Sequence, residues 1–483
     1  MAEQSWSCDC SGYAMNWSIE ASRNAITADV DLRLPHLDDP NSPSRTPISP
    51  SPHGPDTPDA SRRDTTEAIT GTLVQRVVSA VRQGVHVTNR DEERGTPIWA
   101  GLPPAAGELL MATQWDALQH AYGSAEDTPA HLCQLLDEDP EVQAEALGML
   151  DMSVLHQGSL YSSTPPVARF VAAILTHPQT LVEHESFFPW DDRTRPLRAA
   201  LLDWLGRIVD SAAYGEEPGS EGEYGDEDGD QYDGEDEEED EDEREAIRAC
   251  RSIRPELYDA VEPILDDPHP DTREAALGTV TLLLKAPDLA EFVPRAAHRM
   301  RSVLAADGSR RERASAALAM GAWGQDTTGF LNDPDPAVRA CAALASGCAH
   351  VPRATAVLLE ALQNPIEVDH WFPDPLPQVD GWLRFTLLEA VLDRVDAFED
   401  LAPAAMALIP LASDYTVDRD WGPLLVKAFP NGYSPGQPLA VDQRELLQAV
   451  TANEECWGNT GNKLRWLREA GLPEQRDAIR ALL

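Results

Sequence analysis

The chain has 483 residues and a formal net charge of −45, from 83 acidic and 38 basic side chains. So negative a surface repels nucleic acid and anionic lipid, and it favours a basic protein partner. No apolar run approaches the roughly 18 residues that a membrane-spanning helix needs, so we expect no membrane span.

Seven cysteines, an odd number, are spread widely along the chain. This usage is typical of reduced thiols, and together with a first segment that lacks basic and apolar signal regions it predicts a cytoplasmic protein. Cys8 and Cys10 form the one close pair, and no histidine or second pair accompanies them. We therefore expect no metal site and no cofactor.

Residues 1–104 are not expected to form a packed domain. The stretch from Pro35 to Pro58 is rich in proline, serine and aspartate, a composition that cannot bury enough apolar surface to order a backbone. One helix is predicted after the capping-box sequence from Asp64 to Glu67. Two interpretations stay open: a disordered tail, or a start codon assigned too far upstream, with Met111 as the alternative start.

From about residue 105 one pattern recurs at the start of alanine- and leucine-rich helices. Five times an aspartate precedes, by six residues, an arginine or in one case a glutamine. The pairs are Asp137/Gln143, Asp192/Arg198, Asp267/Arg273, Asp307/Arg313 and Asp333/Arg339. Recurrence of one supersecondary unit predicts a repeat array.

The helices that follow these pairs have small apolar residues nearly all round. In the helix after Pro336, alanine, valine and cysteine occupy almost every face, as expected of an inner helix packed between neighbours. Asp–Pro turns precede several of these helices, where proline costs no hydrogen bond. The aspartate either caps free amides or pairs with an arginine of its own or of the neighbouring unit.

These turns, the Val338-Arg339 step and the aspartate-to-arginine spacing resemble the HEAT-repeat family, and the region resembles uncharacterised HEAT-repeat proteins of bacterial genomes. The resemblance implies an all-α, right-handed α-solenoid of irregular HEAT-like helix pairs. It gives the aspartates and arginines a structural role as a stacking ladder. The spacing from Arg313 to Arg339 is shorter than the family's usual unit, as in short bacterial HEAT-like repeats.

An acidic segment, 216–245, divides the predicted repeats into 105–215 and 246–483. It holds 19 acidic residues and a single basic one, Arg244, which predicts an extended, solvated loop. Asp226, Asp228, Asp230 and Glu237 match calcium-loop positions. Gln231 stands where that loop requires glycine, so no calcium site is expected.

Two aromatic loops are the candidate protein-binding residues: Phe187 and Trp190 in one, Trp371 and Phe372 in the other. Aromatic side chains in loops are enriched at interfaces. The alternative is that they pack between uneven repeats, as we expect of Trp421 and Trp457.

The sequence thus favours a non-enzymatic protein-binding scaffold or adaptor that uses its solenoid surface. The alternative is an accessory enzyme related to HEAT-like bilin lyases, which the short units resemble, although no residue set marks a tetrapyrrole site. A third class, HEAT-like glycosylases acting on nucleic acid, needs a cationic face, and the net charge of −45 opposes it.

Overall fold

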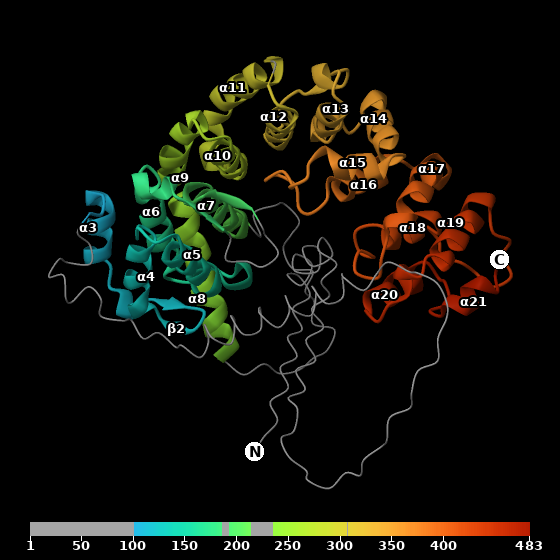
Figure 1. The fold of residues 1–483 in the computed structure, drawn as a ribbon. Helices are drawn as coiled ribbons and strands as arrows, with labels where there is room; N and C mark the ends of the chain where they lie inside the picture. Colours follow the sequence, from blue (N-terminus) through green and yellow to red (C-terminus); the bar gives the residue numbers. More distant parts are fainter. Residues whose placement is uncertain (1–100, 186–192, 214–234, 307) are drawn as a thin grey trace, which may run out of the picture. The chain divides into compact units, whose positions relative to one another are not determined.

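A computed structural model of the chain describes residues 101–185, 193–213, 235–306 and 308–483. These residues are mostly helical, with two short pairs of strands, which confirms the expected helical class (Figure 1). The expected helix after Asp64 and the pair Cys8 and Cys10 lie outside the described residues.

Eight helices up to residue 283 belong to the described chain. They are α3 (Pro104–Ala112), α4 (Thr128–Gln134), α5 (Pro140–Met149), α6 (Thr164–Ile174), α7 (Leu197–Ala213), α8 (Glu235–Ser252), α9 (Arg254–Val261) and α10 (Pro270–Leu283). The next are α11 (Val293–Ala305), α12 (Arg310–Ala322), α13 (Pro336–Ala343), α14 (Pro352–Leu362), α15 (Pro365–Trp371) and α16 (Leu383–Arg394). The last are α17 (Phe398–Leu408), α18 (Trp421–Ala428), α19 (Val441–Ala452), α20 (Asn462–Glu469) and α21 (Arg476–Arg480).

Many of these helices begin at a proline, which fits a first turn because its missing N–H would have no helical partner. Pro140 and Pro336 are examples, and each is preceded by a capping aspartate. Asp139 accepts from the backbone of Glu141 at 3.0 Å, and Asp335 from that of Ala337 at 2.9 Å. The Asp–Pro turns therefore fix where helices start.

Two antiparallel hairpins were not expected from the sequence. In the first, β1 (Gln119–His120) pairs with β2 (Gly123–Ser124). In the second, β3 (Glu183–Glu185) pairs with β4 (Thr194–Pro196) just before α7. Strands this short carry no alternation of apolar and polar residues that could reveal them.

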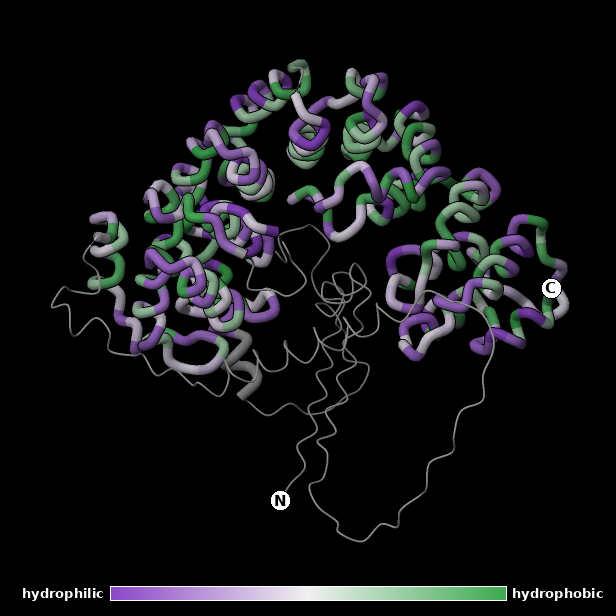
Figure 2. Tube along the Cα trace, in the orientation of Figure 1, coloured by the Kyte–Doolittle hydropathy of each residue, from purple (hydrophilic) through white to green (hydrophobic). Residues whose placement is uncertain are grey.

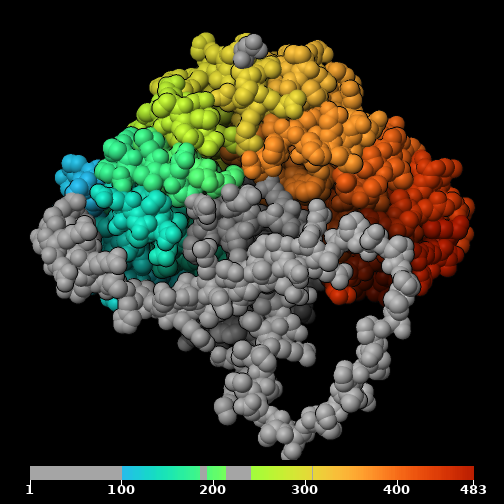
Figure 3. All heavy atoms as spheres, viewed as in Figure 1, coloured from blue at the N-terminus to red at the C-terminus, as the bar shows by residue number. Residues whose placement is uncertain are grey.

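Helices pack mainly on helices that lie near them in the chain. α7 contacts α10, α10 contacts α12, α12 contacts α13, and α13 contacts α14. Apolar residues occur on helices all along the described chain, and the packed helices adjoin their sequence neighbours (Figures 2 and 3). Among the described helices, none is long and apolar enough to cross a lipid bilayer.

Inner helices with small side chains allow this close packing. Every residue of α12 from Ala314 to Met320 is buried, which confirms the prediction that small apolar residues fill all its faces. At the end of α12, an added Cβ on Gly321 would lie 3.1 Å from Ala345. A larger residue there would push the α12 segment away from its neighbour.

The acidic segment differs from the expected loop. α8 begins at Glu235, so 235–245 is helical, and the prediction of an extended chain is wrong for this part. Apolar anchors further along the same helix explain the difference, because Ala246 and Cys250 are buried. Arg248 and Arg244 also pair with Glu241, at 3.1 and 3.3 Å, which relieves repulsion within the helix.

Candidate functional site

The repeated aspartates share one local geometry. The carboxylates of Asp137, Asp267 and Asp333 each accept a hydrogen bond from the backbone N–H two residues further on, at 2.9, 2.8 and 3.0 Å. This turn satisfies an amide just before the helix and leaves the second carboxylate oxygen for another donor. These aspartates therefore form the turn that precedes each helix, whereas the N-cap positions are Asp139, His269 and Asp335.

The second oxygen binds an arginine of an earlier helix in two cases. Arg198 on α7 donates through Nη1 to Asp267 at 2.6 Å, and both side chains are buried. Arg313 on α12 pairs with Asp333 in the same way. Both ion pairs join the start of one helix to the turn before a later one.

The other two arginines donate to carbonyls of their own turn, and Arg273 also pairs with Glu312 on α12 at 2.7 Å. Arg273 Nη1 donates to the carbonyl of Asp267 at 2.9 Å, and Arg339 Nη1 to that of Asp333 at 2.8 Å. Gln143, in the same position, donates to the carbonyls of Leu135 and Gln179 at 3.3 Å. The arginines thus make contacts of two kinds, with a neighbouring helix and with their own turn. Asp192 and Asp307 lie outside the described residues.

Of the four aromatic candidates, Phe187 and Trp190 lie outside the described residues. Trp371 and Phe372, at the end of α15, are only 7% and 9% exposed. Their burial supports the alternative interpretation, packing between repeats. Trp421 is fully buried too, with its ring 6.0 Å from that of Trp457, as expected of core residues.

The chain after Phe372 turns back onto helices far earlier in the sequence. Arg311 on α12 donates to the backbone carbonyls of Asp374 and Pro375, at 2.5 and 2.7 Å. The same guanidinium forms a two-pronged ion pair with Glu274 on α10, which fixes its orientation. We call 373–380 the strap; no pattern in the sequence indicated its place.

A cationic side chain that the sequence left unassigned lies at the start of α16. Arg384 is almost fully buried, pairs with Asp369 on α15, and stacks 3.5 Å above the Trp382 ring centroid. Burial lowers the pKa of Arg384, against the opposing effect of Asp369. Arg384 lacks the preceding aspartate of the repeat pattern, and its partner comes from a different helix.

Buried acids gather near α18. Asp414 binds Lys463 at 2.8 Å, and both are buried. Asp420 caps α18 by accepting from the backbone of Trp421. Burial raises the pKa of Asp420 to about 7, although hydrogen bonds from Thr416 and Trp421 act in the opposite direction. This carboxyl therefore changes charge near neutral pH.

Other candidates have structural surroundings. His156 lies at a helix end, as expected, with Nδ1 3.0 Å from the carbonyl of Met152. The five cysteines of the described chain are free thiols. Within the described ranges, no three or more histidine, cysteine or acidic side chains are grouped to hold a metal. The calcium-loop match from Asp226 falls largely outside those ranges.

The exposed carboxylates at the end of the acidic segment lie on α8. Glu241, Asp242, Glu243 and Glu245 are all exposed. Among the described residues, only Glu241 of these four has an ion pair, shared between Arg244 and Arg248. This end of α8 thus retains an excess of negative charge.

Comparison with protein-family models, with curated proteins and with solved structures gave no match. The function is therefore inferred from the side chains and their contacts.

Proposed function

We propose that the chain is a protein-binding scaffold without catalytic activity of its own, built as an α-solenoid of HEAT-like helix pairs from about residue 105 onward. The observation that carries this proposal is the repeated ion pair between units, Arg198 with Asp267 and Arg313 with Asp333. A repeat array in which each unit contacts its neighbours presents an extended surface to polypeptides.

The distribution of side chains agrees with this role. The polar groups that recur along the proposed repeats are used within turns and between helices, as at Asp333, which accepts from its own turn and pairs with Arg313. Between them, helices such as α12 bury small apolar residues on all sides. Such an arrangement favours a function in which the outer surface of the chain binds a partner.

We further propose that the partner is a basic protein and that nucleic acid is not a partner. The chain's charge of −45 and the exposed carboxylates of α8 attract cationic groups. Attraction of this kind speeds encounter more than it tightens a complex, and it weakens as salt screens the charges. A cytoplasmic location is proposed from the spacing of the seven cysteines.

Capture from native lysate tests the scaffold. The tagged chain would be bound at low salt, washed over a salt series, and its ligands identified by mass spectrometry and absorbance. We expect a polypeptide to be retained and to elute progressively as salt rises. Recovery of a tetrapyrrole or of nucleic acid instead would refute the proposal, the former in favour of the lyase-related alternative.

A further inference from the structure

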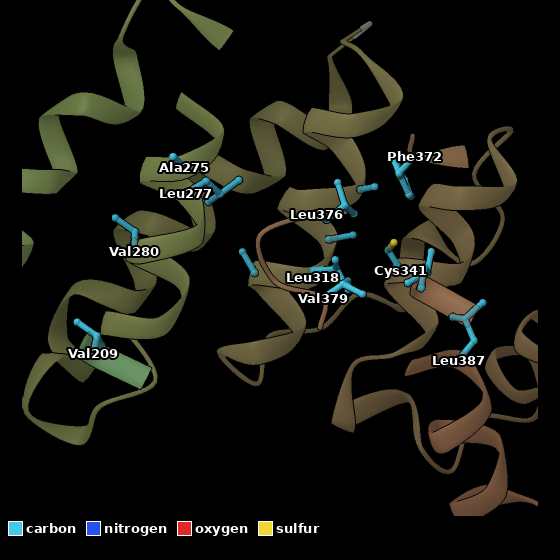
Figure 4. Close-up of a cluster of buried hydrophobic side chains, with 14 of the residues drawn as sticks. Val209, Ala275, Leu277, Val280, Leu318, Cys341, Phe372, Leu376, Val379 and Leu387 are labelled. Carbon is cyan, nitrogen blue, oxygen red and sulfur yellow. The ribbon is translucent and has the colours of Figure 1, made fainter. Parts of the chain in front are cut away.

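The strap is bound to α10 and α12 much as a peptide ligand is bound to a receptor. The Arg311 guanidinium donates hydrogen bonds to two main-chain carbonyls of the strap, those of Asp374 and Pro375. Leu376 and Val379 are buried at 2% and 8% exposure. They belong to the same buried cluster as Leu318 of α12 and Leu277 of α10 (Figure 4).

The tip of the strap is a tight turn. The Val379 N–H donates to the Leu376 carbonyl at 2.9 Å, which places Pro377 at the second position, where its fixed φ suits a β-turn. The two residues that flank the turn are the two whose side chains are buried. The strap thus presents an apolar–proline–polar–apolar turn to the helices.

Gly278, inside α10, has no side chain and so leaves room for Pro377 of this turn. A Cβ added to Gly278 would lie 2.5 Å from the Cβ of Pro377, closer than real contacts allow. Glycine is costly in a helix interior, and here its place is explained by the proline that packs against it. Gln378 adds a side-chain hydrogen bond to Thr281 at 3.4 Å.

Main-chain hydrogen bonds combined with pockets for alternate side chains are how proteins recognise peptides. We propose that the α10–α12 surface is a docking site for a partner's apolar–proline–polar–apolar turn, and that the strap occupies it as an internal ligand. This inference rests on the proposed scaffold function and names the surface and the partner chemistry for it.

Tethering makes the strap a competitor. It is held at both ends, by α15 and by α16, and Arg419, just before α18, binds Asp380 at 2.9 Å. A short tether gives the strap an effective concentration on the order of millimolar. A free turn must therefore have a dissociation constant far below that concentration to displace the strap. The strap therefore excludes weak partners from the surface.

The test uses the strap's own sequence as the probe. A fluorescein-labelled peptide of residues 372–381 is titrated by anisotropy into the full chain and into a variant whose strap is replaced by an equally long glycine–serine linker. We expect saturable binding to the linker variant and at least about ten-fold weaker binding to the unmodified chain. A peptide of scrambled order should not bind either protein.

A matched pair of glycines locates the site. In the linker variant, Gly278→Ala fills the space of Pro377 and should abolish peptide binding. Gly107→Ala, in α3, meets nothing within 4 Å and should leave it unchanged. Equal effects of the two substitutions, or no tighter binding by a folded linker variant than by the unmodified chain, would overturn the inference.

Should the linker variant not fold, Leu376→Ser in the full chain replaces it, because it weakens the strap without removing it. Peptide binding must then exceed that of the unmodified chain. If this variant is folded and does not bind, or is itself unfolded, the strap is part of the core and the docking site does not exist. The capture of a polypeptide from lysate by the unmodified chain would still support the scaffold.

Discussion

Replacing Arg198 by methionine tests the stacking ladder. Methionine keeps the aliphatic part of the side chain but removes the charge. Arg198 donates to Asp267 at 2.6 Å, to Thr180 at 3.0 Å and to the carbonyl of His177 at 3.4 Å. Its loss leaves the Asp267 carboxylate, only 5% exposed, without a cation. Breaking one side of a buried ion pair lowers the free energy of unfolding by about 3–5 kcal/mol.

The control is an ion pair of similar geometry at the surface. Arg169 donates to Glu256 at 2.8 and 2.9 Å, but these side chains are 39% and 57% exposed. Arg169→Met should cost less than about 1 kcal/mol, because solvent screens an exposed pair.

Urea unfolding followed by circular dichroism measures the difference. With a slope of about 3 kcal/mol per molar, Arg198→Met should lower the midpoint by about 1 M or more, and Arg169→Met by only about 0.3 M. Adding Asp267→Asn to Arg198→Met should recover part of the loss, since it removes the uncompensated buried charge. Equal midpoints for Arg198→Met and Arg169→Met would refute the ladder as a source of stability.

Three further predictions concern buried groups. Trp371→Ala should lower the unfolding free energy by about 3–5 kcal/mol in a thermal melt, against little change for exposed Tyr415→Ala; unchanged melting with lost partner binding would return Trp371 to the interface. Asp420 has a raised folded pKa of about 7. The stability contributed by its protonated carboxyl is therefore fully present below about pH 4 and is lost as the pH rises through 7. Relative to the wild type, Asp420→Asn should therefore gain at most about 4 kcal/mol between pH 4 and 8, and a pH-independent difference would contradict this. With Cys8, Cys10 and the half-buried Cys133 changed to serine, the four remaining thiols should react with a thiol reagent only after unfolding, whereas rapid native reaction would contradict their burial.

Local pattern was enough to predict the helical class. The six-residue spacing from aspartate to arginine places both side chains at the start of the same helix. The sequence alone therefore predicts that the two residues lie near each other. Which partner each arginine takes was not predictable. Arg198 reaches Asp267, 69 residues on, whereas Arg273 binds its own turn and Glu312, 39 residues on.

The strap and α8 are two features whose structure could not be predicted from the sequence. The strap's partner, Arg311, lies 63 residues before Asp374, and no periodicity links the two. In α8, charge alone predicted an extended chain, but tertiary burial of Ala246 and Cys250 favours a helix instead. In both cases contacts with other helices, which the local sequence does not record, decide the structure.

Native mass spectrometry of the tagged chain, captured from its own cells at low salt, tests the scaffold most directly. The proposal predicts a species heavier than the bare chain by the mass of a whole polypeptide, lost as the ionic strength rises. A bare chain at every salt concentration, or an added mass of only a few hundred daltons as a bound tetrapyrrole would give, would contradict it.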